Sequence, residues 1–189
     1  MPSSENPWNS LEWAKLLVAI LTPLSVVLFG WFVSRRLKRL ELVQWSNQKL
    51  IEKRLMVYDA VAPLLNKLLC FYTWVGYWKD ISPSDVIKAK RDIDQTFHIY
   101  RPLFDEEVYN AYQAYIRLLF KTFTGAGMDA KIRANLRGRD GDRTTHCTYE
   151  WDPGWVRCFS ETDVVSETEV REHYNRLMQE LRRSLGVHK

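Results

Sequence analysis

The sequence predicts an all-α protein: an N-terminal transmembrane helix continues into a bundle of about four helices that carries one long aromatic-rich loop. Three observations predict this fold. Residues 16–33 form a run of 18 residues without a charge, and no glycine or proline interrupts residues 34–62. Three later segments each combine a helix-start signal with apolar residues at helical spacing. We therefore expect residues 1–37 to form a tail and anchor, 38–49 a helical stalk, and 50–189 the bundle.

The uncharged run has the length of a membrane span. A helix rises about 1.5 Å per residue, so 18 residues reach roughly 27 Å, close to the ~30 Å hydrocarbon core of a bilayer. Pro23 would break a soluble helix but is tolerated in membrane helices. Trp13 precedes the run and Trp31 lies near its end, and indole rings favour the two membrane–water boundaries. These features indicate a membrane anchor.

Charge order predicts the orientation of this anchor. Lys15 alone precedes the run, whereas four basic residues follow it directly: Arg35, Arg36, Lys38 and Arg39. By the positive-inside rule the N-terminus lies outside and the body lies in the cytosol, in a single-pass arrangement. A cleaved signal peptide carries its charge before the apolar run, which is the opposite order. A buried core helix remains the alternative, but the chain has little protein left to surround it.

The long helix is expected to pack from about Leu50 onward and to kink or break at Pro63. Its apolar residues follow steps of four and three, which is a regular packing seam. The seam comprises Ile51, Leu55, Tyr58, Ala62, Leu65, Leu69, Tyr72 and Gly76. The part from Leu68 to Trp78 is apolar over only 11 residues, which is typical of a buried, interfacial or re-entrant segment.

Three further helices have clear start signals. Ser82 is an expected cap, with Pro83 at the first helical position and Asp85 in the first turn. Ser166–Glu169 reads as a capping box, and Asp105–Glu107 places acidic residues at a helix start. Pro102, the glycines at 125 and 127, and Gly186 are the expected stops. The expected buried faces are Val86, Ile93, Phe97 and Tyr100; Val108, Tyr112, Ile116, Leu119, Phe120 and Phe123; and Val170, Tyr174, Leu177, Leu181 and Leu185.

Residues 124–165 form a long insertion with weak periodicity. Loops of this length are usually functional or disordered, and the aromatic content here argues against disorder. Around Asp152-Pro153-Gly154 the sequence predicts a short hairpin.

No catalytic residue, metal site or cofactor is predicted. His146, Cys147, Cys158 and His173 lack the paired cysteine knuckle of a structural zinc site. Gly125-Ala126-Gly127 lacks the lysine of a phosphate-binding loop, and no G-x-S-x-G is present. The odd number of cysteines, three, fits a reducing compartment better than a disulfide framework.

Two features of the insertion are candidate contacts. Five basic residues surround two glycines, and they are suited to a phosphate of a lipid headgroup or nucleic acid: Lys131, Arg133, Arg137, Arg139 and Arg143. The alternative is a solvated loop with internal ion pairs. Trp151 and Trp155 lie further along, and tryptophan together with arginine favours a protein interface.

At Gln48–Asp80 and Gly125–Arg133 the chain resembles a widespread bacterial group of small membrane-anchored helical proteins. Its build also resembles the membrane effectors of phage-defence modules, including retron-type systems. The resemblance implies an effector in the inner membrane that a partner holds inactive and that damages the membrane on release. The implied partners are the lipid bilayer, a protein of the same module or a second copy, with nucleic acid involved only indirectly.

Two other functions stay open. One is a membrane-tethered adaptor that recruits a cytosolic protein through the bundle. The other is an enzyme acting on lipid or nucleotide, which would depend on the basic residues of the insertion.

Overall fold

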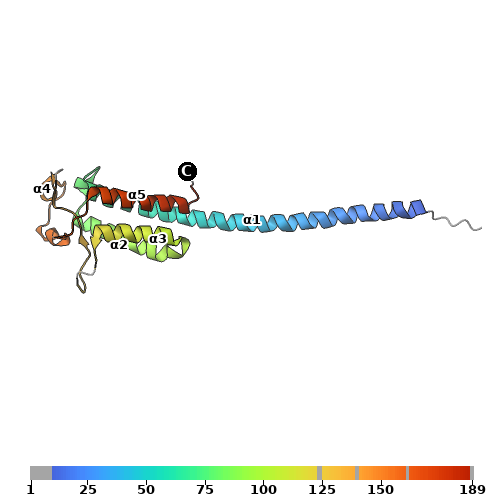
Figure 1. The fold of residues 1–189 in the computed structure, drawn as a ribbon, viewed down its shortest axis with the longest axis horizontal. Helices are drawn as coiled ribbons and strands as arrows, with labels where there is room; N and C mark the ends of the chain where they lie inside the picture. Colours follow the sequence, from blue (N-terminus) through green and yellow to red (C-terminus); the bar gives the residue numbers. More distant parts are fainter. Residues whose placement is uncertain (1–9, 123–124, 139–140, 161, 188–189) are drawn as a thin grey trace, which may run out of the picture. The chain divides into compact units, whose positions relative to one another are not determined.

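The chain is mostly helical. The structure, a computed structural model, describes residues 10–122, 125–138, 141–160 and 162–187. Its long helices are α1 (Ser10–Thr73), α2 (Pro83–Tyr100), α3 (Glu106–Leu119) and α5 (Glu167–Ser184) (Figure 1). Short helices are η1 (Trp78–Asp80), η2 (Arg101–Leu103), α4 (Arg143–His146) and η3 (Pro153–Cys158). Four two-residue strands complete it: β1 (Phe120–Lys121), β2 (Lys131–Ile132), β3 (Arg137–Gly138) and β4 (Gly141–Asp142).

The chain divides into two compact units, Met1–Lys49 and Leu50–Lys189. The second, which we call the helical body, contains the core. Buried side chains there come from the end of α1, from α2, α3, α5, β1 and β2, and from Ile81, Ala134 and Phe159 in the connecting segments.

The buried face of α1 agrees with the predicted seam only in part. Leu65 and Tyr72 of the seam are buried, and Tyr58 and Leu69 pack against the core. Ile51 and Leu55 are instead 43% and 47% exposed, and Val57, Val61 and Leu68, which are not in the seam, are buried. Packing therefore begins near Val57, and the expectation that it begins near Leu50 with Ile51 and Leu55 was wrong. Two apolar stripes run side by side along this helix, and spacing alone does not decide which one faces the core.

Helix α1 continues through Pro63, so the predicted break is not seen. Pro63 lacks the N–H that would bond the carbonyl of Asp59. Both residues are exposed, so water is available to that carbonyl. The cost of the proline is therefore smaller here than it is in a buried helix interior.

The predicted cap at Ser82 and the predicted capping box at Ser166 are confirmed, and Ser82 forms a complete capping box as well. The Ser82 hydroxyl accepts from the Asp85 N–H at 3.1 Å, and the Asp85 carboxylate accepts from the Ser82 N–H at 3.0 Å. Ser166 and Glu169 repeat this arrangement with both bonds at 3.2 Å. After α5 the chain turns at Gly186, whose φ of +79° suits glycine.

The predicted faces of α2, α3 and α5 largely lie in the core. Tyr100, Tyr174 and Leu185 are half-buried, and Phe123 lies outside the described residues. The other members are buried: Val86, Ile93, Phe97, Val108, Tyr112, Ile116, Leu119, Phe120, Val170, Leu177 and Leu181. The end of α3 was mispredicted. This helix stops at Leu119, because the next residue enters β1 and pairs with Ile132.

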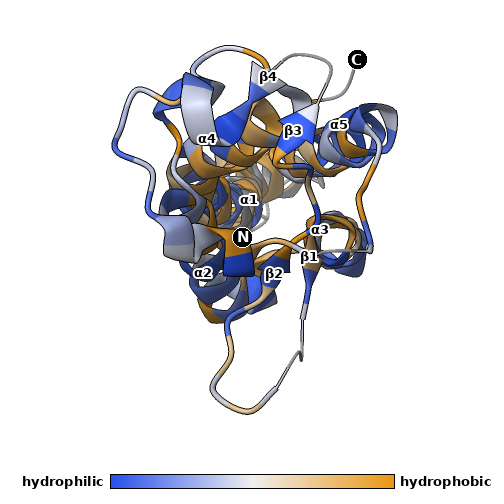
Figure 2. Ribbon diagram, turned by 90° about the vertical axis from the view of Figure 1, so that its left-hand side faces the viewer, coloured by the Kyte–Doolittle hydropathy of each residue, from blue (hydrophilic) through white to orange (hydrophobic). Residues whose placement is uncertain are grey.

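The insertion contains two small antiparallel hairpins rather than the one predicted. Strand β1 pairs with β2, and β3 pairs with β4. Figure 2 looks onto the end of the body that carries both pairs, with β3, β4 and α4 on one side and β1 and β2 on the other. The predicted hairpin at Asp152 is instead the start of η3, because the Asp152 carboxylate accepts from the Gly154 N–H at 2.7 Å.

At the end where α1 enters the helical body, Arg54 joins several elements. Its Nε donates to the carbonyl of Leu103 in η2 at 2.6 Å, and its Nη1 donates to the carbonyl of Ser184 in α5 at 2.7 Å. The carboxylate of Asp105, the N-cap of α3, lies 3.7 Å from Nη2. One side chain that is 15% exposed therefore connects α1, η2, α3 and α5.

Arg54→Ala should lower the free energy of unfolding by about 3 kcal/mol, because it removes two charge-assisted hydrogen bonds and leaves two carbonyls without donors. Urea unfolding of the full chain in detergent, followed by far-ultraviolet circular dichroism, measures this. The control is Arg183→Ala at the same end, whose exposed pair with Glu180 should contribute less than about 1 kcal/mol. Equal losses in the two variants would contradict the role assigned to Arg54.

Candidate functional site

The N-terminal part of α1 is apolar enough to span a membrane. Trp13–Lys38 has a mean hydropathy of 2.4 and no buried residue in its most apolar window. A second stretch, Gln44–Thr73, passes the same test of length and composition with a mean hydropathy of 1.3, but 39% of its window is buried. Its end, including Leu68 and Phe71 of the short apolar segment considered above, belongs to the core of the helical body.

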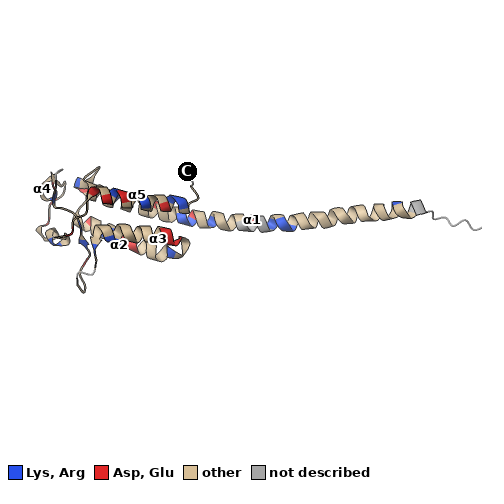
Figure 3. Ribbon diagram, viewed as in Figure 1, with Lys and Arg blue, Asp and Glu red and all other residues tan. Residues whose placement is uncertain are grey.

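The predicted boundary residues pair with rings one helical turn away. The guanidinium of Arg35 lies 4.7 Å from the ring of Trp31, and that of Arg36 lies 5.3 Å from the ring of Phe32. Cation and ring thus share one surface at the end of the apolar stretch, as an interface between hydrocarbon and water requires. Figure 3 shows this basic cluster directly after the uncharged part of the helix. Lys38 and Trp13 are exposed, and the side chain of Arg39 lies outside the described residues.

The basic residues of the insertion do not form one open cluster. Arg133 donates to the carbonyls of Asp163 and Arg117, at 3.3 and 3.1 Å. Arg137 pairs with Asp142 at 2.6 Å. Lys131 is half-buried, and Arg139 lies outside the described residues. These contacts favour the alternative of internal pairing over a phosphate site.

Arg143 is buried, with 2% of its surface exposed. Its guanidinium carbon lies 3.9 Å from the ring centre of Phe71 and 3.7 Å from that of Trp74. Nη2 donates to the carbonyl of Phe71 at 2.7 Å, and Nε donates to that of Asn135 at 2.9 Å. Nη1 has no partner, and no carboxylate of the described residues forms an ion pair with Arg143.

Burial lowers the pKa of the Arg143 guanidinium to about 9. Coulombic interactions with Tyr72, Tyr149 and Glu167 act in the opposite direction and raise this pKa. The group is still charged at neutral pH. Aromatic faces and carbonyl oxygens supply the negative potential that a carboxylate usually provides around a buried cation. Sequence reasoning placed Arg143 among solvated bases, because no local signal distinguishes it from its neighbours.

The two candidate tryptophans are half-buried and lie together. The rings of Trp151 and Trp155 are 5.6 Å apart, and Tyr149 lies 5.6 Å from Trp155. Trp151 also packs against the core. Part of the aromatic surplus therefore holds the insertion in place, and the exposed parts of both rings remain available for contact.

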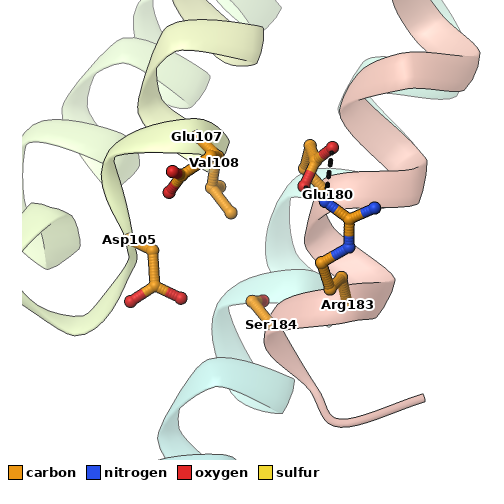
Figure 4. A pocket seen from close by; sticks show the side chains of 6 residues that line it. All are labelled: Asp105, Glu107, Val108, Glu180, Arg183 and Ser184. Atoms are coloured by element: carbon orange, nitrogen blue, oxygen red, sulfur yellow. Dashed lines mark hydrogen bonds and ion pairs between the residues drawn. The ribbon is translucent and has the colours of Figure 1, made fainter. Parts of the chain in front are cut away.

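A small pocket lies between the start of α3 and the end of α5 (Figure 4). It has a volume of about 240 Å³ and is lined by Asp105, Glu107, Val108, Glu180, Arg183 and Ser184. Arg183 pairs with Glu180 at 2.9 Å, so the basic group of the pocket is partly neutralised. In the described part of the chain no group of three or more His, Cys, Asp or Glu side chains is placed to hold a metal ion.

No family model, curated protein or solved structure matches this chain. The functional argument therefore rests on the residues themselves. Among them, the apolar part of α1 has the most specific physical meaning, because an uncovered helix of this hydropathy is unstable in water and stable in lipid.

The full chain should stay in the membrane pellet after alkaline carbonate extraction, whereas a truncation starting at Gln44 should be released. The truncated chain keeps Gln44–Thr73, so its release would show that this stretch is a core helix and not a second span. Release of the full chain by carbonate would contradict the anchor.

Alkaline pH should unfold the helical body. Burial raises the pKa of Tyr72, Tyr112, Tyr115 and Tyr149 above the ordinary value of 10.0, for Tyr149 to about 12. Their contribution to stability is complete below pH 10 and is lost as pH rises towards 12, because the unfolded chain releases its phenol protons first. The lowered pKa of Arg143 raises the free energy of unfolding as pH rises, which is the opposite effect. Four tyrosines lower it over the same range, so their effect prevails.

Tyrosinate absorbance and helical circular dichroism, recorded together, test this. The buried tyrosines should ionise only as the helix signal is lost. Their complete ionisation with the helices intact would contradict the assigned burial.

Proposed function

We propose that this chain is a membrane-anchored effector of bacterial antiviral defence, which a partner protein holds inactive and which acts on the integrity of the inner membrane. The observation that carries the proposal is the uncovered apolar helix Trp13–Lys38. The basic cluster after it supports a single pass with the N-terminus outside and the helical body in the cytosol.

The helical body supports the part of the proposal that concerns a partner. The end of α1 together with α2, α3 and α5 would make a cytosolic domain, Leu50–Lys189, of the size of an ordinary protein-binding domain. Trp151 and Trp155 in its insertion are half-buried. Such rings, together with arginine, are the side chains that protein interfaces favour.

The span itself supports the action on the membrane. One side of the helix carries a shallow groove lined by Ser25, Val26, Phe29 and Gly30. A Cβ added at Gly30 would meet nothing within 4 Å, so the backbone is accessible there. Helices in lipid associate at such small residues, because the backbones approach closely. Release from the partner would let the spans assemble through this groove and open the bilayer.

A membrane-tethered adaptor is the second candidate, and one observation favours it. Ile51, Leu55 and Met56 are 43%, 47% and 44% exposed on α1, within the helical body rather than in the span. An apolar patch on a helix outside the membrane is typical of a docking surface. No observation on the described residues favours the enzyme, because the basic residues that would support it contact the chain itself.

Induced expression without the partner should admit a membrane-impermeant dye, and Gly30→Leu should reduce dye entry by about tenfold by blocking close approach of the spans. Leu24→Phe is the matched control. By helical periodicity Leu24 lies on the far side from Val26 and Phe29, so this variant should keep full dye entry. Western blots of the membrane fraction would confirm equal insertion.

Intact polarisation at full expression of the released chain would contradict the effector. A truncation from Gln44 separates the two functions, since the effector should lose all toxicity while an adaptor's body should still bind its partner. Equal loss of dye entry in the Gly30 and Leu24 variants would show that the groove has no special role.

A further inference from the structure

Arg143 is the one buried side chain of the segment Gly141–His146 in the helical body. The chain ahead of this segment is held by Ala134, which is 5% exposed, and by Leu136, which packs against the core. Before it, Ile132 is fully buried, and its carbonyl accepts from Ser160 at 2.8 Å. After it, the N–H of Thr148 donates to the carbonyl of Lys79 at 3.1 Å, and the Tyr149 hydroxyl donates to that of Ile81 at 3.0 Å. Between these two attachments, β3, β4 and α4 offer only two-residue strands and a four-residue helix.

Arg143 is the side chain that holds this segment on the end of α1. Its Nη2 bonds the carbonyl of Phe71, and its guanidinium lies between the rings of Phe71 and Trp74. Its Nε donates to the carbonyl of Asn135 at 2.9 Å, and its backbone N–H donates to that of Leu136 at 2.9 Å. Two glycines also lie close to tryptophan rings at this place. A Cβ at Gly138 would lie 3.2 Å from the ring of Trp74, and a Cβ at Gly141 would lie 3.7 Å from the ring of Trp78.

The closed arrangement carries two local costs at the same place. Trp74 has a φ of +54° and is the one residue other than glycine with positive φ among those described. That conformation is unfavourable for a bulky side chain. The Nη1 of Arg143 is buried without an acceptor, which is costly for a charged group. Both costs disappear if Arg143 returns to water and the backbone at Trp74 relaxes.

We propose that β4 and α4, Gly141–His146, form a strap that opens as a unit from the end of α1, with Arg143 as its plug, while the long helices stay packed. Opening would expose the aromatic surface of Phe71, Trp74 and Trp78, which the plug covers in the closed state. The strap is a property of the helical body alone and does not depend on the proposed function.

Hydrogen exchange of the full chain in detergent micelles, read by mass spectrometry, tests the strap. In the wild type, the amides of 141–146 should exchange at least about tenfold faster than those of α3, because opening is local. Arg143→Ala should raise exchange in 141–146 and at Trp74 by a further factor of about ten or more, with α2, α3 and α5 unchanged. Arg157→Ala, which removes an exposed arginine of η3 outside the segment, should leave exchange in 141–146 within about twofold.

Chemical rescue distinguishes a plug from general packing. Ethylguanidinium matches the atoms that Arg143→Ala removes, so at millimolar concentration it should restore protection of 141–146. Equal concentrations of urea should not. Arg143→Lys keeps the charge but loses the fork that bonds both carbonyls, and it should open the strap to an intermediate extent.

Three results would overturn the strap. One is exchange of 141–146 in the wild type that is as slow as in α3. The second is faster hydrogen exchange in all helices together in Arg143→Ala, or failure of both Arg143 variants to fold. Either outcome would show that Arg143 stabilises the whole fold and not the strap alone. The third is local opening that ethylguanidinium does not reverse.

Discussion

The helical body depends on arginine side chains that donate to backbone carbonyls. Arg54 bonds the carbonyls of Leu103 and Ser184 at one end, and Arg143 bonds those of Phe71 and Asn135 at the other. Helix ends leave carbonyls without intrahelical donors, and a guanidinium with five N–H groups satisfies several of them at once. Between these two points the apolar faces of the helices supply the bulk of the stabilisation, but they do not fix how the ends meet.

Different groups offset the cost of burying charge at the two arginine side chains. Arg54 keeps a carboxylate within 3.7 Å and remains partly exposed, so its charge is shared with solvent. Arg143 has aromatic rings in place of an acid, and burial lowers its pKa. Arg54 therefore depends mainly on its two carbonyl bonds, because its acid partner is exposed, whereas Arg143 depends on its carbonyl bonds together with the aromatic faces.

Local signals in the sequence predicted much of the helical structure. The Ser82 and Ser166 capping boxes act over three residues, so their outcome is independent of the tertiary fold. The apolar stripes of α2, α3 and α5 were unambiguous because each has one polar face. The seam of α1 was right at Leu65 and Tyr72 but wrong at Ile51 and Leu55, since apolar residues surround much of this helix and only its neighbours decide which face is buried.

The candidate site was less predictable, because its contacts are long-range. Arg143 meets Phe71 across 72 positions of sequence, and nothing near either residue indicates the pairing. The hairpins at β1 and β3 were also missed, since two-residue strands have no detectable alternation. The apolar stretch Trp13–Lys38, by contrast, is evident from composition alone, because length and hydropathy and not particular partners decide whether a helix could span a bilayer.

The acceptors of Arg54 also set an order of events during synthesis. Leu103 leaves the ribosome 49 residues after Arg54, and Ser184 leaves it 130 residues after. At translation rates of about 5–20 residues per second, roughly ten seconds separate the arginine from its last acceptor. The nascent helical body therefore stays incompletely closed at this end, with one acceptor of Arg54 missing, until α5 has been synthesised.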